Sequence, residues 1–184
     1  MNIIVKPYNS ELCYCRPDTT WEKESRDLYV PEGVDKLLWA PVIFARVSKA
    51  GKCVSHKFVG RYYDAVGFGA LAYSNEDNIA FSSCLDHTSL LPMPLYNPAV
   101  LENEENTFGV IIGEQNIAFQ VSKSMQESIE QAICMVSKRV SLRIGDMVAL
   151  EIAPLQIAAE RKKGEVKMKA EFCENTLFDL KVIF

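Results

Sequence analysis

Hydrophobic and polar residues alternate most regularly near the C-terminal end of the chain. Residues 165–172 place an apolar side chain at every second position between charged ones, which predicts a strand with one buried and one wetted side. The pattern repeats in 178–184, after a turn at Glu174–Asn175. Residues 107–112 and 116–121 predict a hairpin. We therefore expect the C-terminal part of the chain to consist mainly of strands.

The N-terminal half contains two further strand patterns. A short one covers Ile3–Val5, and a longer apolar and β-branched one runs from Trp39 to Ser48, before a turn at 49–52. Pro41 has no backbone N–H to donate to a neighbouring strand. We therefore expect this part of the strand to lie at a sheet edge or a bulge.

Two segments have the spacing of helices. Residues 56–65 carry apolar side chains at helical intervals, and 66–72 would end that helix and begin a strand. The second helix is expected to begin at a capping box of Ser124 and Glu127 and to end near Lys138–Arg139, whose charges suit the negative end of the helix dipole. Its apolar stripe consists of Met125, Ile129, Ala132, Ile133 and Val136.

Many strands with only two helices indicate an α+β fold that is mostly β, with antiparallel or mixed sheet. The 184 residues suffice for one sizeable core, so we expect a single domain over residues 1–184. The formal charge of −4 argues against a nucleic-acid partner or an anionic membrane surface. The chain has no signal-peptide pattern and no apolar run that could span a bilayer, which predicts a cytoplasmic protein.

The six cysteines do not form a metal-binding pattern. Cys13 and Cys15 are closer together than the cysteines of a zinc knuckle, and the only histidines are His56 and His87. We expect the cysteines to be buried structural side chains, which stay reduced in the cytoplasm.

Several polar segments are candidate sites with a simpler structural interpretation. Asp86–His87 could bind a ligand or exchange a proton, but a turn is favoured. The Glu-x-Glu in 102–105 is expected to be a solvated loop, and 161–164 an exposed turn between strands. Gly67–Gly69 does not lie between a strand and a helix, so it does not indicate phosphate binding.

Five segments, in order along the chain, resemble motifs of one enzyme family. Residues 61–69 are very similar to its Arg-Tyr-Tyr-Asp-x-Val-Gly-Leu-Gly motif. The family is that of fumarylacetoacetate hydrolase, which includes acylpyruvate hydrolases and 2-oxo-4-pentenoate hydratases. The resemblance implies a rolled, mixed β-sheet of the C-terminal-domain type with two main helices, commonly dimeric, and a Mg²⁺ or Mn²⁺ site in a central pocket. The other four segments are Arg16–Thr19, Ala45–Lys52, Val136–Asp146 and Thr176–Lys181.

The resemblance also assigns positions to the family's metal ligands. Its substrates present a 2-oxo acid or 1,3-diketone, whose carbonyl the metal polarises. The two glutamates of the family's Glu-x-Glu pair correspond to Ala40 and Val42, and its aspartate corresponds to Leu71. None of these hydrocarbon side chains can bind a divalent cation, which prefers carboxylate oxygens. We therefore expect no metal and no other cofactor.

Further pocket positions follow from the same resemblance. The family's lysine corresponds to Ser83, ahead of Asp86, and its Thr-Gly-Thr-Pro segment corresponds to residues 150–153, which begin with Leu150. Glu151 is an acid in an otherwise apolar strand that could face the pocket. A shifted alignment at Glu76–Asp77 could restore one metal ligand. The N-terminal lid region has Glu11 but no histidine to act as a base. The inherited pocket positions are thus Ala40, Val42, Leu71, Ser83, Asp86 and Leu150.

Two hypotheses follow. The first is a non-catalytic homologue that acts as a binding protein or partner subunit: a homodimer, a partner of an active relative, or a binder of an unidentified small molecule. The second is a divergent hydrolase, hydratase or decarboxylase of 2-oxo acids or 1,3-diketones that uses Mg²⁺ or Mn²⁺ through relocated ligands. The hydrocarbon at the three ligand positions favours the first hypothesis.

Overall fold

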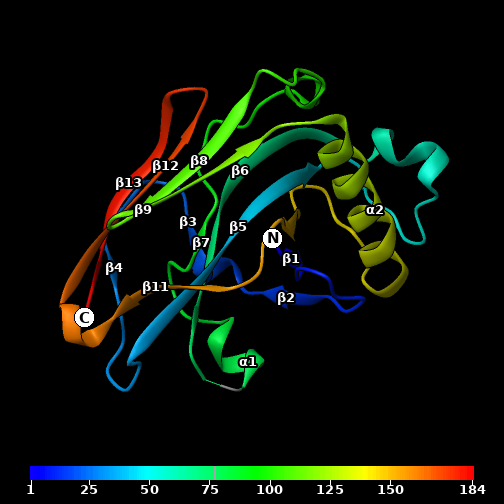
Figure 1. The fold of residues 1–184 in the computed structure, drawn as a ribbon. Helices are drawn as coiled ribbons and strands as arrows, with labels where there is room; N and C mark the ends of the chain where they lie inside the picture. Colours follow the sequence, from blue (N-terminus) through cyan, green and yellow to red (C-terminus); the bar gives the residue numbers. More distant parts are fainter. Residues whose placement is uncertain (77) are drawn as a thin grey trace.

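The computed structural model describes residues 1–76 and 78–184, without the side chain of Ile79. Its strands form two mixed sheets (Figure 1). The larger sheet has the order β2 (Tyr14–Arg16), β1 (Ile3–Lys6), β10 (Met147–Glu151), β5 (Lys36–Val47), β6 (Tyr63–Ser74), β7 (Ser89–Leu90) and β3 (Trp21–Glu22), and β11 (Gln156–Glu160) also pairs with β5. The smaller has the order β4 (Leu28–Tyr29), β13 (Asn175–Ile183), β12 (Glu165–Phe172), β8 (Thr107–Ile112) and β9 (Gln115–Gln120).

Helices contribute little of the fold. The long helix α2 covers Lys123–Arg139, and α1 is a single turn at Ile79–Ser82. Four short 3₁₀ segments lie at Asp18–Thr20, His56–Arg61, Pro98–Glu102 and Arg161–Lys163. Within the described chain, no helix has the length and apolar character to cross a membrane.

The larger sheet rolls up so that β2, at one end of its strand order, approaches β6 and β7 near the other end. Arg16 on β2 donates hydrogen bonds to the carbonyl oxygen of Ala72 on β6 and to Thr88 just before β7, although β2 and β6 are separated by three strands in the sheet order. The inner side of this roll has its own apolar cluster, which includes Val5, Val42 and Leu71. The expected rolled, mixed β-sheet is therefore confirmed.

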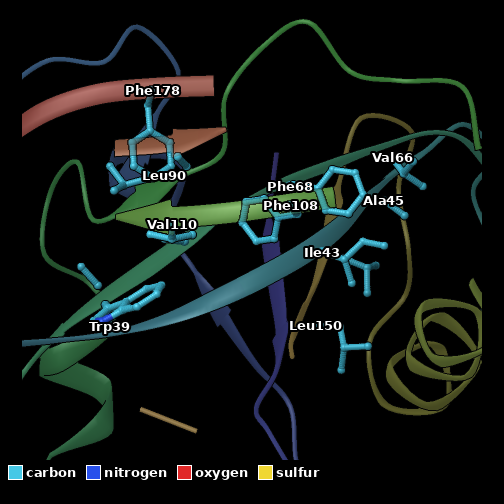
Figure 2. Close-up of a cluster of buried hydrophobic side chains, with 14 of the residues drawn as sticks. Trp39, Ile43, Ala45, Val66, Phe68, Leu90, Phe108, Val110, Leu150 and Phe178 are labelled. Atoms are coloured by element: carbon cyan, nitrogen blue, oxygen red, sulfur yellow. The ribbon is translucent and has the colours of Figure 1, made fainter. Parts of the chain in front are cut away.

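The main hydrophobic core lies on the outer side of the roll. There, β5 and β6 pack against the smaller sheet, and the Phe68 ring stacks on the Phe172 ring at a centroid distance of 4.6 Å. Ile129 and Ile133 of α2 are fully buried in the same core. Figure 2 shows Phe68, Phe108 and Trp39 within this cluster. Because both sides of β5 and β6 are covered, these strands are apolar at nearly every position.

The predicted strands and hairpins agree with the structure, but the helix predicted over 56–65 is wrong. Only a six-residue 3₁₀ segment forms there, at His56–Arg61, and the chain enters β6 at Tyr63. Residues 63–74 pair with β5 along its length, and this long-range pairing outweighs the local helical spacing. The helix α2 is confirmed, although its N-cap is Ser122 and Ser124 lies within its first turn.

We expected Pro41 to lie at a sheet edge or a bulge; the edge alternative is wrong, and the strand pairing is instead interrupted beside Pro41. β5 is an interior strand with partners on both sides. The Pro41 carbonyl oxygen accepts a hydrogen bond from Ile152 N. The nitrogen of a strand residue points to the same neighbouring strand as its carbonyl, so the Pro41 nitrogen also faces this segment. The segment lies between the end of β10 and the start of β11, where no strand pairs with this side of β5. The missing N–H therefore costs no ladder hydrogen bond.

The cysteines are not buried as predicted. Cys15, Cys53 and Cys84 are exposed, and Cys13, Cys134 and Cys173 are half-buried, all as free thiols. Apolar neighbours in sequence did not predict burial. Cys15 lies on a strand, where successive side chains point to opposite sides, and Cys53, Cys84 and Cys173 lie in turns or loops outside the strands.

Two glycines allow close packing in β6. A Cβ atom on Gly69 would lie closer than 3.0 Å to the carbonyl oxygen of Leu90 on β7, and one on Gly67 would meet the ring of Phe44. A backbone oxygen in a sheet cannot move aside, so the Gly67–Gly69 segment has a packing role. Close packing therefore accounts for the presence of glycine at positions 67 and 69 of this chain.

We predict that Gly69→Ala destabilises the protein by about 3 kcal/mol, at the upper end of the usual cost of overpacking a core. Gly60→Ala is the control, because nothing lies within 4 Å of a Cβ at that position. Urea unfolding of both variants measures the difference, and equal midpoints would contradict the packing role.

Candidate functional site

Three of the sequence-assigned pocket positions meet inside the roll. Ala40 on β5 lies directly opposite Leu71 on β6, and Val42 lies two residues further along the same side of β5. All three side chains are 0% exposed. Val42 and Leu71 belong to the inner apolar cluster, together with Val5 and Tyr73. The positions that the resemblance gives to metal ligands are therefore adjacent in space.

A chain of hydrogen bonds lies beside this cluster. Glu151 is the register partner of Val42 and points to the same side of the sheet. Its Oε1 accepts from the Tyr73 hydroxyl at 2.5 Å, and its Oε2 accepts from Tyr8 N at 3.0 Å. The Tyr14 and Tyr73 hydroxyl oxygens are 2.6 Å apart. Because Tyr73 gives its only proton to Glu151, the Tyr14 hydroxyl is the donor to Tyr73.

Burial keeps both phenols protonated. Desolvation raises the pKa of Tyr14 to about 12 and raises the pKa of Tyr73 well above its ordinary value. At neutral pH, both hydroxyls therefore act as neutral hydrogen-bond donors, and neither is positioned as a base.

Arg16 is a fully buried cation next to this chain. Its Nε donates to the Ser83 carbonyl oxygen at 2.8 Å, and Nη2 donates to the Ala72 carbonyl oxygen and to the Thr88 hydroxyl. Its guanidinium carbon lies 4.8 Å from the centroid of the Tyr73 ring, a cation–π contact. Among the described residues, Nη1 has no hydrogen-bond partner. Burial lowers the pKa of Arg16, but a guanidinium stays charged at neutral pH.

The remaining predicted positions contribute no side chain to this hydrogen-bonded group. Ser83 is buried and contacts Arg16 only through its backbone carbonyl. Asp86 and His87 are exposed and lie in a turn, and His87 Nδ1 lies 3.0 Å from Glu22 Oε2.

The placement of Leu150 in the inherited pocket is wrong. Leu150 is the register partner of Ile43 and joins the outer core, on the other side of the sheet (Figure 2). Its neighbour Glu151 takes the inner side, because successive side chains in a strand alternate.

The other acidic segments stay outside the site. Glu76 is exposed, and Asp77 lies outside the described residues. The segment Glu102–Glu105 is a largely exposed end of a 3₁₀ turn and loop. No group of three His, Cys, Asp or Glu side chains suited to holding a metal ion occurs in residues 1–76 and 78–184.

A small cavity opens onto the hydrogen-bonded chain. Its volume is about 290 Å³, and its walls come from the segment after β1, from β2, from β6 and from the end of β10. Glu151 is the only charged residue in the lining. The lining residues are Pro7, Ser10, Leu12, Cys13, Tyr14, Tyr73, Glu151 and Leu155.

The fold matches solved structures of one family. A fumarylacetoacetate hydrolase family protein from Yersinia pestis CO92 matches with a TM-score of 0.78 and 12% identity, over 99% of this chain and 92% of that one. This chain has the fumarylacetoacetate hydrolase fold. Fumarylpyruvate hydrolase from Pseudomonas aeruginosa, solved with Mn²⁺ and pyruvate, matches with a TM-score of 0.78 and 12% identity, over 100% and 90% of the two chains.

The same fold carries other reactions. The 5-carboxymethyl-2-hydroxymuconate delta-isomerase from Mycobacterium smegmatis matches with a TM-score of 0.76 and 10% identity, over 99% of this chain and 78% of that one. At the level of sequence, no protein-family model and no curated relative matches. A shared fold does not determine the reaction, so function must be argued from the site.

The site residues do not fit the metal that accompanies this fold in the Pseudomonas enzyme. Mn²⁺ and Mg²⁺ require several oxygen ligands. Here the side chains of Ala40, Val42 and Leu71 offer none, and Glu151, the register partner of Val42, adds one carboxylate. Each of its two oxygens accepts one hydrogen bond from the protein, and a single carboxylate supplies too few oxygen ligands for a divalent ion.

Sequence reasoning missed most of this polar network. Tyr14 and Tyr73 are 59 residues apart and have no shared local pattern. Arg16 stands in a segment that resembles a family motif, but its burial follows only from the rolling of the sheet. Glu151 gave a signal, since it is an acid in an otherwise apolar strand.

We predict that Tyr73→Phe destabilises the protein by about 1–3 kcal/mol, because it leaves a buried carboxylate oxygen and the Tyr14 hydroxyl without their partner. Tyr29→Phe is the matched control, since the Tyr29 side chain is 71% exposed and its change is expected to stay within about 0.5 kcal/mol. Chemical unfolding measures both, and similar stabilities would show that the network contributes nothing.

Proposed function

We propose that this chain is a member of the fumarylacetoacetate hydrolase family that lacks metal-dependent catalysis and acts as a binding protein or partner subunit. The main observation behind this proposal is the apolar inner face of the rolled sheet. Ala40, Val42 and Leu71 are adjacent and fully buried there. The motifs along the chain and the fold both support membership of the family.

The energetics favour the non-catalytic interpretation. A divalent cation placed among hydrocarbon side chains loses its hydration without gaining ligands, and the desolvation penalty for even a single charge is several kcal/mol. One carboxylate, that of Glu151, cannot replace three. Without the metal, the family's way of polarising a 2-oxo acid carbonyl has no equivalent among the inner side chains.

The position of Glu151 supports the same proposal. The family's Thr-Gly-Thr-Pro segment corresponds to residues 150–153, and its glycine position is Glu151 here. The Glu151 side chain extends into the interior and bonds to Tyr73. It places a negative charge where the family's substrates bring their own carboxylate, so an anionic 2-oxo acid would be repelled.

The alternative is a divergent hydrolase, hydratase or decarboxylase with relocated Mg²⁺ or Mn²⁺ ligands. We further propose a cytoplasmic protein that forms a homodimer or pairs with an active relative. Sedimentation of the purified chain, alone and mixed with such a relative, tests the assembly.

We predict that calorimetric titration with Mn²⁺ gives no binding below millimolar concentrations, and that the protein neither hydrolyses acylpyruvates nor decarboxylates oxaloacetate above the rate in buffer. An active family member under the same conditions is the positive control. Tight Mn²⁺ binding together with turnover would establish the alternative.

A designed variant tests the inherited geometry. Ala40→Glu, Val42→Glu and Leu71→Asp together place three acids in a buried apolar cluster, which we expect to destabilise the protein by at least about 3 kcal/mol without metal. Mn²⁺ should then raise its melting temperature, or restore folding if the variant is unfolded.

The matched control carries Ala40→Gln, Val42→Gln and Leu71→Asn, which have nearly the same shapes but no charge. Mn²⁺ should leave its melting temperature unchanged. Equal responses of the two triple variants would show that these positions do not form the inherited metal site.

A further inference from the structure

Glu151 is a buried acid without an ion-pair partner. Its residue is only 5% exposed, and no salt bridge to it occurs within residues 1–76 and 78–184. Its two protein partners, the Tyr73 hydroxyl and Tyr8 N, are neutral donors. An ionised carboxylate has about four acceptor sites, so about two remain for another donor. Buried charges in proteins are normally paired.

Arg16 makes no hydrogen bond or salt bridge to Glu151, although the two opposite charges interact electrostatically. Its guanidinium lies over the Tyr73 ring and donates to two carbonyl oxygens and the Thr88 hydroxyl, not to Glu151. Arg16 is also absent from the lining of the 290 Å³ cavity, whereas Glu151 is part of it. A molecule in that cavity therefore meets the acid and not the guanidinium.

The other lining residues indicate which chemical groups of a cationic ligand the cavity suits. Tyr14 and Tyr73 line the cavity. The guanidinium of Arg16 already lies over the Tyr73 ring, so Tyr14 offers the aromatic ring that attracts an ammonium group. Pro7, Leu12 and Leu155 supply apolar surface. Leu12 is 68% exposed, so it stands at the solvent side. The volume lies at the lower limit of small-molecule sites, which restricts the ligand to a small one.

We infer that this cavity binds a small primary amine in its ammonium form, with the charged group on Glu151 and an apolar body against Leu12 and Leu155. The inference rests on the proposed binding role and names its ligand class. A divalent metal does not fit, because one carboxylate supplies too few oxygen ligands. An anion is disfavoured, because Glu151 is the only charged lining residue.

Three probes share a phenylethyl group and differ in the charge of the group attached to it. They are 2-phenylethylamine, which is a cation at pH 7, neutral 2-phenylethanol and the anion 3-phenylpropanoate. In calorimetric or NMR titration at pH 7, we expect the amine to bind about tenfold more tightly than the alcohol, because both donate a hydrogen bond to the Glu151 carboxylate but only the ammonium adds the attraction of an opposite charge. The carboxylate should bind most weakly. Equal binding of amine and alcohol, or preference for the carboxylate, would overturn the inference.

The variant Glu151→Gln keeps the shape of the side chain and removes its charge. We expect it to bind the amine no better than the alcohol. Glu114→Gln, in the exposed turn between β8 and β9, changes the net charge by the same amount outside the cavity and should bind the amine like the wild type. If both variants lose the amine equally, the site is not at Glu151.

A second pair of variants covers the case in which Glu151→Gln does not fold. Leu12→Lys places a positive charge at the exposed side of the cavity, and Leu12→Gln places a neutral polar group of similar size there. We expect the lysine variant to weaken amine binding at least about fivefold relative to the glutamine variant, through charge repulsion. Equal affinities would contradict the inference.

The outcomes separate this inference from the proposed function. Absence of amine binding, with no Mn²⁺ binding and no turnover, would reject the ligand class and leave the non-catalytic assignment intact. Mn²⁺ binding with turnover would reject the proposed function whatever the amine result.

Discussion

The inner face of the β5–β6 pair imposes the main constraint on this protein. The two strands pair along almost their whole length, and both of their sides are covered. On the outer side, the smaller sheet and α2 provide the cover, as the main core shows. On the inner side, the roll brings β1, β2 and β10 over the same strands. Any side chain at Ala40, Val42 or Leu71 must therefore be compatible with burial in a closed apolar space.

That constraint explains how the polar residues of the interior are arranged. Glu151 and Arg16 are both buried, and each has its hydrogen bonds supplied mainly by backbone groups and hydroxyls. The Tyr73 side chain lies between them, with its hydroxyl on the acid and its ring against the guanidinium. A buried polar network is most favourable when all its members are satisfied, and here Arg16 Nη1 has no hydrogen-bond partner among the described residues. The network joins β2, β6 and β10 beside the apolar cluster that contains Val42 and Leu71.

The sequence predicted those parts of the fold that depend on local alternation. The strands of 165–184 and the hairpin of 107–121 repeat every second residue, so their buried sides could be identified directly. The helix expected over 56–65 failed because the spacing there fits two structures, and pairing with β5 decided between them.

The sequence predicted the candidate site only where the positions that the family motifs assigned lie on the inner side of the paired strands. Ala40, Val42 and Leu71 met in space because two paired strands carry them. Leu150 was misplaced by one residue, and one residue in a strand reverses the side chain's direction. The Tyr14–Tyr73–Glu151 chain joins three distant segments, so no local pattern could reveal it.

The most direct test of the central claim is a crystal structure of the wild-type protein grown with Mn²⁺, with anomalous diffraction measured at the manganese absorption edge. The account predicts no anomalous peak inside the roll, and Val42 and Leu71 in van der Waals contact with their apolar neighbours. A peak beside Ala40, Val42 and Leu71, coordinated by Glu151 and other acids, would contradict it.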